Sequence, residues 1–267
     1  MDHRLFGGVE EICRGRSGTF CGSRHSAEKF CQTRATAHPS VTEPIIVVGP
    51  GRCGTSCVAG VLHHLGVFMG SRLVGAHPSN PYGHWEDYDF LEPNAALLDR
   101  KMATQEWERK VLSLIESRRQ LGIPWGWKDP RTCHLLGRYL EFLDAPKFIR
   151  CVRSPREIEA SMVRAYSHCG WTQQSARAVR RRREEELDAY LPWYQTLTID
   201  FNDLRRHRET TVRRVIEFCG LALATKAQFR GAVNFVRPSA ATFPAPLPPL
   251  RQAPRRSRVG QSDSRSK

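Results

Sequence analysis

Residues 42–66 read TEPIIVVGPGRCGTSCVAGVLHHLG, and this stretch decides the fold. The run at 45–48 is apolar and β-branched without alternation, which is typical of a parallel strand buried on both faces. A glycine-rich turn follows at 49–54, and from Thr55 onward apolar residues recur at helical spacing until Gly66, a residue type that commonly ends helices. The order of strand, glycine loop and helix brings backbone N–H groups and a helix N-terminus to one point, which favours anion binding.

The loop nearly matches the nucleotide-binding pattern G-x-x-x-x-G-K-[ST] between Gly49 and Ser56. Thr55 stands in the lysine position, and the cation of the loop is Arg52. A nucleoside triphosphatase needs that lysine on the β- and γ-phosphates. We therefore predict a phosphate-like donor that is bound without the triphosphate machinery. The alternative is a glycine turn that merely packs a helix on a sheet.

Strand and helix patterns alternate through the middle of the chain, which predicts an α/β fold with a three-layer arrangement: a parallel sheet flanked by helices. Asp129 is expected to cap the helix that starts near residue 131. The expected ordered domain covers residues 44–237, between an N-terminal arm at 1–43 and a Pro/Arg-rich tail at 238–267, both predicted to be disordered. The expected further strands are 125–127, 147–152 and 197–201, and the expected further helices are 85–98, 104–120, 131–143, 156–168, 172–191, a turn at 202–204, and 210–220.

Composition narrows the class of protein. The net charge is +14, and a basic excess remains within the expected domain, which suits an anionic donor or an acidic acceptor. Nine cysteines form no C-x-x-C pair, so we expect reduced thiols and neither a zinc site nor a disulfide framework. The sequence has no run of about 18 apolar residues and no apolar region of a secretory signal, so we expect a cytoplasmic protein.

A second constellation follows the strand expected at 147–152, where the sequence reads RSPREIEAS. Arg153 leaves the end of this strand, and Ser161 lies eight residues on, within the following helix. Ligands of α/β proteins bind at the C-terminal edge of the sheet. The planar fork of arginine suits bidentate phosphate binding, and a hydroxyl supplies one more donor. The alternative is a surface arginine and a core serine.

Together, GPGRCGTS at 49–56 and RSPREIEAS at 153–161 resemble the nucleotide-binding motifs of sulfotransferases that use 3′-phosphoadenosine 5′-phosphosulfate (PAPS), in particular their prokaryotic-type branch. The resemblance covers about residues 44–237 and includes the blocks GHWED, WKDPRT and IDFNDL. It implies a P-loop-like fold and transfer of a sulfuryl group from PAPS to a hydroxyl or amine of a small-molecule, glycan or lipid acceptor. Arg52 stands where many relatives carry lysine, and the glycine/lysine-rich C-terminal motif of cytosolic animal members is missing.

The resemblance also assigns residues to the donor. It implies that Arg153 and Ser161 hold the 3′-phosphate. It implies no metal ion, because no triphosphate is hydrolysed. The loop residues that it places at PAPS are Gly51, Arg52, Cys53, Gly54, Thr55 and Ser56.

Three residues are candidates for acceptor chemistry. The resemblance favours Glu86 as general base, because the family's matching carboxylate is given that role; partial burial can raise a carboxylate pKa into a useful range. His84 is the runner-up, since the ordinary pKa of histidine lies closer to neutrality. Lys128 can reach the transferred sulfuryl group from a strand end. The alternatives are that Glu86 only adds charge at a helix N-terminus, and that Lys128 pairs with Asp129 or another neighbour.

Two other functions fit parts of the sequence. A P-loop kinase or NTPase would use Arg52 in place of lysine and Asp129 or Asp200 for magnesium. A nonenzymatic basic protein could bind nucleic acid through its arginine runs, although no aromatic-interleaved platform is present. We interpret the charged helix at 172–191 as a solvated face with i,i+4 pairing. The aromatic residues considered for an acceptor pocket, with core packing as the alternative, are Tyr82, Trp85, Trp125 and Trp127.

Overall fold

The computed structural model describes residues 43–77, 80 and 83–237. Its four-stranded sheet has the order β2-β1-β3-β4, and each neighbouring pair is parallel. Ile46 of β1, one of the two inner strands, lies opposite Trp127 on one side and Phe148 on the other. The expected parallel sheet is therefore confirmed. The strands are β1 (Ile45–Val48), β2 (Gly126–Lys128), β3 (Lys147–Val152) and β4 (Thr196–Asp200).

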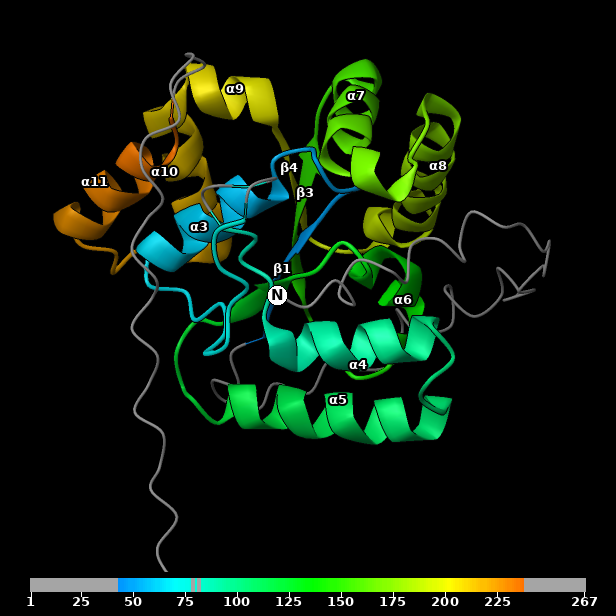
Figure 1. Cartoon of the computed structure of the whole chain (residues 1–267). Helices are drawn as coiled ribbons and strands as arrows, with labels where there is room; N and C mark the ends of the chain where they lie inside the picture. The colour runs from blue at the N-terminus through cyan, green and yellow to red at the C-terminus, as the bar shows by residue number, and fades with distance from the viewer. Residues whose placement is uncertain (1–42, 78–79, 81–82, 238–267) are drawn as a thin grey trace, which may run out of the picture.

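Helices follow the strands and cover both faces of the sheet (Figure 1). Residues 1–42 of the predicted arm at 1–43, Tyr82 and the predicted tail at 238–267 lie outside the described residues. The helices are α3 (Thr55–His64), α4 (Tyr88–Leu98), α5 (Thr104–Arg119), α6 (Thr132–Tyr139), α7 (Pro155–Ala165), α8 (Gln173–Tyr190), α9 (Phe201–Arg206), α10 (Arg208–Cys219) and α11 (Lys226–Phe235), with short 3₁₀ helices at Ser167–Cys169 and Leu191–Trp193.

The core has two parts because successive strand residues point to opposite faces. Ile45 and Val47 join the cluster that includes residues of α3, α10 and α11. Ile46 and Val48 join the cluster with α4, α5 and α6. Two helical layers therefore enclose one sheet, which confirms the three-layer fold. In Figure 1, α4 and α5 lie side by side below the sheet, and α7 and α8 stand together beside β3.

Three sequence expectations about local structure need correction. Asp129 does not cap α6: the N-cap is Arg131, and the Asp129 carboxylate accepts from Asn94 Nδ2 and from the backbone N–H of Arg131 instead. That helix is also shorter than expected. A capping box at Thr225 starts α11, which the sequence analysis did not predict.

Trp125 and Trp127 are core residues and do not line an acceptor pocket. Both side chains are fully buried, and the Trp127 ring stacks on Phe90 with centroids 4.4 Å apart. Trp85 is also buried, where it lies edge-on to Phe235. The alternative of core packing is therefore correct for these tryptophans.

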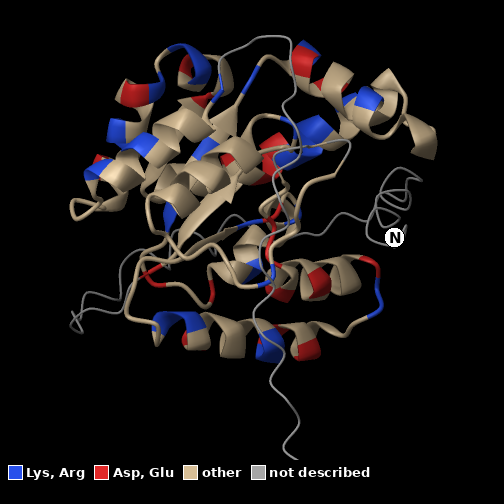
Figure 2. Cartoon of the chain, turned by 60° about the vertical axis from the view of Figure 1, so that its left-hand side comes forward, with Lys and Arg blue, Asp and Glu red and all other residues tan. Residues whose placement is uncertain are grey.

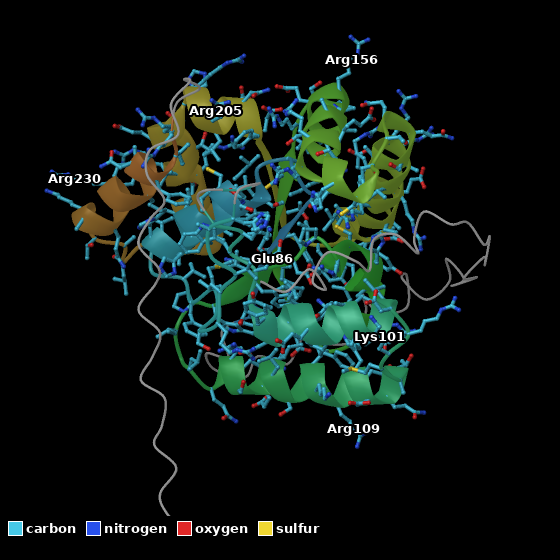
Figure 3. The ribbon with its side chains drawn as sticks, viewed as in Figure 1. Glu86, Lys101, Arg109, Arg156, Arg205 and Arg230 are labelled. Carbon is cyan, nitrogen blue, oxygen red and sulfur yellow. The ribbon has the colours of Figure 1, made fainter. Side chains whose placement is uncertain are left out.

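Figure 2 shows that Lys and Arg positions (blue) and Asp and Glu positions (red) are distributed over many of the helices. In Figure 3, Lys101, Arg109, Arg156 and Arg230 point outward from the periphery, whereas Glu86 lies at the centre of the molecule. Within the described residues, no helix is both long enough and apolar enough to cross a membrane.

Candidate active site

The glycine loop joins β1 directly to α3 at the C-terminal edge of the sheet. Gly54 is the N-cap residue of α3, with a φ of 97°, and its carbonyl accepts from Cys57 N and Val58 N. A Cβ at this position would lie 2.3 Å from the Phe201 ring, so glycine is required for both its conformation and its size. The first N–H groups of α3 have no acceptor within the helix, and they lie where the loop turns. This is the geometry expected of an anion site.

The structure brings the two predicted nucleotide-binding motifs together. Arg52 Nε donates to Ser161 Oγ at 3.1 Å, although 109 residues separate them. Arg153 Nη1 donates to the Arg52 carbonyl at 3.5 Å, and its guanidinium lies 5.2 Å from the centroid of the Phe201 ring. The loop after β1 and the turn after β3 therefore form one cluster.

Arg153 also retains hydrogen-bonding capacity. Its Nη2 donates to Glu157 Oε1 at 3.1 Å, but its Nε is buried and has no hydrogen-bond partner within the described part of the chain. A buried donor without an acceptor is costly, and an anion would satisfy it. The predicted contact of Arg153 with a phosphate therefore fits its surroundings.

Cys53, although predicted at the donor, has a side chain that is fully buried beneath the loop. Burial raises the pKa of its thiol to about 11, against the opposing effect of hydrogen bonds from the amides of Gly51 and Thr55. The residue is therefore a neutral thiol at physiological pH, and only its backbone is available to a ligand. Thr55 is buried at the start of α3, and the neighbouring Ser56 is partly exposed.

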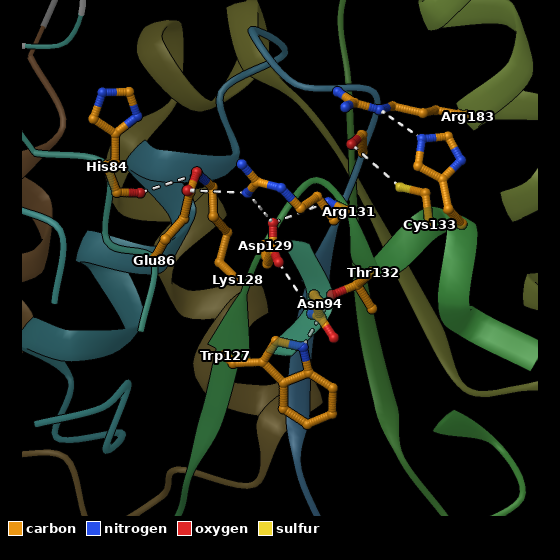
Figure 4. Close-up of polar contacts among 12 residues, drawn as sticks. His84, Glu86, Asn94, Trp127, Lys128, Asp129, Arg131, Thr132, Cys133 and Arg183 are labelled. Carbon is orange, nitrogen blue, oxygen red and sulfur yellow. Dashed lines mark hydrogen bonds and ion pairs between the residues drawn. The ribbon is translucent and has the colours of Figure 1, made fainter. Parts of the chain in front are cut away.

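Glu86 and Lys128 form a buried ion pair. Lys128 Nζ lies 2.6 Å from Glu86 Oε1 and donates to the carbonyl of His84 at 3.0 Å. Glu86 Oε2 lies 3.9 Å from Arg131 Nη1, so two cations flank one carboxylate (Figure 4). Lys128 therefore has a neighbouring partner, as the alternative allowed, but that partner is Glu86 and not Asp129.

His84 is a poor general base in this environment. Burial, followed by the charges of Lys128, Arg52, His77 and Arg131, lowers the pKa of its imidazole to about 3. The argument for His84 relied on an ordinary pKa near neutrality and is wrong. The ring is neutral at physiological pH, and its carbonyl serves as an anchor for Lys128.

A hydrogen-bonded chain connects the Glu86 site to the aromatic core. Arg131 Nη1 lies 3.0 Å from Asp129 Oδ1, and Asp129 Oδ2 accepts from Asn94 Nδ2 at 3.0 Å. The Asn94 carbonyl oxygen then accepts from Trp107 Nε1 at 3.0 Å and from the Tyr139 hydroxyl at 2.7 Å. Asp129, Asn94, Trp107 and Tyr139 are buried. Their hydrogen bonds fix the partly buried Arg131 side chain beside Glu86.

Two further residues near the cluster were not predicted from the sequence. Arg183 of α8 is buried and donates to the Pro50 carbonyl at 2.8 Å, so the interpretation of α8 as a solvated face is wrong at this position. The signal was present, because Arg183 is spaced four residues from each of Val179 and Leu187, both of which are buried. Tyr166 lies at the end of α7: burial raises its pKa, while Arg52 lowers it and Glu86 raises it, so both charges are nearby.

The two acids considered for magnesium already have other roles. Asp129 binds Asn94 and Arg131, and Asp200 caps α9 by accepting from Asn202 N and Asp203 N. Among the described residues, no group of three or more His, Cys, Asp or Glu side chains is arranged to hold a metal ion.

Comparisons with known proteins bear on the family and on the fold. A family model described as "Sulfotransferase family" matches residues 69–225. The crystal structure of sulfotransferase STF1 from Mycobacterium tuberculosis H37Rv superposes with a TM-score of 0.50 at 18% identity, covering 86% of this chain and 85% of that one. The crystal structure of sulfotransferase STF9 from Mycobacterium avium gives a TM-score of 0.48 at 15% identity, covering 73% and 68%. No curated protein sequence matches the chain.

Proposed function

The chain belongs to the sulfotransferase family, and from this premise we propose that it uses PAPS as donor and sulfates a hydroxyl or amine of a small-molecule, glycan or lipid acceptor. The observation that carries the proposal is the 3.1 Å hydrogen bond between Arg52 and Ser161, which joins the two predicted motifs at one edge of the sheet. One nucleotide with phosphates at both ends can bridge such a cluster.

The residues present fit the donor. The glycine loop offers backbone amides and a helix N-terminus, and Arg153 has a buried nitrogen without an acceptor in the described chain. We assign the 5′-phosphosulfate to residues 51–56 and the 3′-phosphate to Arg153 and Ser161. PAPS supplies the activated sulfuryl group, and Arg52 with the loop amides stabilises negative charge on the phosphate that leaves.

Glu86 is proposed to accept the proton of the acceptor hydroxyl or amine. Lys128 and Arg131 hold the carboxylate from two sides, so its orientation does not depend on a flexible rotamer. Lys128 also lies at the end of β2, on the same edge as the glycine loop, which supports a second role near the transferred group. Positioning and charge stabilisation by these residues are the main contributions expected from the chain.

A mass-spectrometric screen tests the activity. The protein is incubated with PAPS and pooled hydroxylated small molecules, glycans and lipids, and products are searched for the gain of one sulfuryl group. Product formation with wild type and its loss in Glu86→Gln would support the proposal. No product from any pool, together with no binding of adenosine 3′,5′-bisphosphate, would contradict it.

The kinase alternative is separated by ligand preference. Protection from thermal unfolding is compared for adenosine 3′,5′-bisphosphate and for ATP with magnesium. We expect protection by the bisphosphate, because Asp129 and Asp200 are occupied by structural hydrogen bonds. Stronger protection by ATP with magnesium would favour a phosphotransferase.

A further inference from the structure

The arginine run at 180–183 contains one member unlike its neighbours. Arg181 and Arg182 are exposed on α8, whereas Arg183 is buried. A buried guanidinium is unfavourable unless its donors find partners. Arg183 Nη1 donates to the Pro50 carbonyl at 2.8 Å across 133 residues of sequence. The same nitrogen lies 3.2 Å from the place where a Cβ of Gly51 would be, so the guanidinium lies directly against the glycine loop.

A histidine and a glutamate hold Arg183 from the other side. Arg183 Nε donates to His134 Nε2 at 3.4 Å, so this nitrogen is the unprotonated one. His134 Nδ1 then carries the proton and donates to Glu186 Oε2 at 2.5 Å. Burial, the largest influence, lowers the pKa of His134, which is consistent with a neutral ring. The order Glu186, His134, Arg183 places a compensating negative charge behind the buried cation.

The contact with Pro50 controls the direction of a loop amide. In a planar trans peptide the carbonyl and the next N–H point in opposite directions. When Arg183 fixes the Pro50 carbonyl, it also fixes the Gly51 N–H, which points to the Cys53 thiol on the other side of the loop. The preceding carbonyl, that of Gly49, accepts from the Cys133 thiol at 3.5 Å (Figure 4). Helices α6 and α8 therefore anchor two successive carbonyls at the entrance to the loop.

We propose that Arg183, held by His134 and Glu186, is a positioning residue that keeps the glycine loop in its anion-binding conformation. The assignment of the 5′-phosphosulfate to this loop rests on the function proposed above. The positioning itself is a property of the unliganded protein. Arginine suits the role because its planar fork reaches Pro50 and His134 at once, whereas lysine has a single nitrogen to offer.

Hydrogen exchange of the loop amides tests the positioning without a ligand. In Arg183→Gln we expect faster exchange in peptides that cover residues 50–57, and in His134→Gln a smaller change in the same peptides. Arg181→Gln is the matched control, because Arg181 is exposed on the same helix. If Arg183→Gln fails to fold, Arg183→Lys keeps the charge and is expected to loosen the same peptides. Unchanged exchange in a folded Arg183 variant overturns the inference.

Nucleotide binding supplies the second readout, by calorimetry. We expect Arg183→Gln to lower the affinity for adenosine 3′,5′-bisphosphate about tenfold. The affinity of Arg183→Lys should lie between those of Arg183→Gln and wild type. Adenosine 3′-monophosphate lacks the 5′ group and should bind wild type and Arg183→Gln equally. Equal weakening of both nucleotides would point to general damage and contradict the inference. If wild type binds neither, the proposed function fails, and the exchange experiment still decides the role of Arg183.

Discussion

The two halves of the proposed site use positive charge in different ways. On the loop side, arginines donate to neutral oxygens: Arg52 to a serine hydroxyl, Arg153 to the Arg52 carbonyl and Arg183 to the Pro50 carbonyl. Arg153 also forms an ion pair there, with the Glu157 side chain, which is 41% exposed. On the other side, Lys128 pairs with Glu86 and Arg131 with Asp129. Bonds to neutral groups leave a cation's charge available to an anionic ligand, whereas ion pairs cancel much of it. The first side is thus suited to hold phosphates and the second to orient a carboxylate.

The largest expected effect concerns Glu86, the carboxylate of the paired side. Glu86→Gln should lower turnover about a thousandfold, because the acceptor proton loses its base. Affinity for adenosine 3′,5′-bisphosphate should stay near wild type, since the loop side is unchanged. Turnover is measured with the acceptor found in the screen, and affinity for the bisphosphate is measured by calorimetry. Glu92→Gln, an exposed glutamate paired with Arg72, is the control. Turnover that survives in Glu86→Gln would remove this residue from the mechanism.

The Glu86–Lys128 ion pair should make a measurable contribution to the free energy of unfolding. Lys128→Met removes the nearer of the two cations from the buried Glu86 carboxylate and leaves Arg131 at 3.9 Å, so the free energy of unfolding should fall by about 3 kcal/mol in urea denaturation. The double variant Glu86→Gln/Lys128→Met should lose less free energy of unfolding than the summed losses of the two single variants.

The exposed pair Lys110–Glu106 on α5 is the matched control for this double-mutant cycle of Glu86 and Lys128. Lys110→Met and Glu106→Gln should be almost additive, because solvent screens an exposed pair. Equal coupling in the two cycles would contradict the view that burial makes the Glu86–Lys128 pair special.

On the loop side, Arg153→Lys should lower the affinity for adenosine 3′,5′-bisphosphate about tenfold, as measured by calorimetry, because lysine cannot form the two parallel hydrogen bonds of a guanidinium. Arg156→Lys, at an exposed arginine in the first turn of the following helix α7, should bind the bisphosphate as wild type does. If the two variants behave alike, the 3′-phosphate is held elsewhere.

The smallest expected effect is the pH dependence of stability from His84. Its folded pKa of about 3 lies below the ordinary value, so the unfolded chain binds the proton first and stability falls as the pH drops below about 6.5. Between pH 6.5 and pH 4.5, the free energy of unfolding of His84→Gln should fall by about 2 kcal/mol less than that of wild type.

A difference between variants is the appropriate measure for His84. Asp87, whose pKa burial raises to about 6, gives the opposite slope in the same range, and this contribution is common to both proteins. His168→Gln, at an exposed position, controls for loss of a histidine. Parallel pH curves for wild type and His84→Gln would show that this ring is not buried in its neutral form.

Local patterns predicted much of the fold and the loop side of the site. The unbroken apolar run of β1, the glycines after it and the spacing of α3 are contiguous in sequence, so their structure follows from short-range rules. The turn at Arg153 is local in the same way, as a strand end followed by a proline that starts α7.

The partners of the charged residues did not follow from sequence. Lys128 and Glu86 are 42 residues apart, and only the packing of the segment before α4 against the end of β2 brings them together. Asp129 was expected to act on its own helix, but Asn94 and Arg131 compete for its carboxylate. The burial of Arg183 was not predicted, because the charged residues around it suggested a helix exposed to solvent. Its four-residue spacing from the buried positions Val179 and Leu187 was visible in the sequence.

The central claim is that the loop after β1 and the turn after β3 hold opposite ends of one nucleotide. A crystal structure with adenosine 3′,5′-bisphosphate tests it most directly. We predict the 5′-phosphate in the loop at residues 51–56 with Arg52 facing it, and the 3′-phosphate at Arg153 and Ser161. A nucleotide bound away from both arginines, or with both phosphates in bulk solvent, would contradict the account.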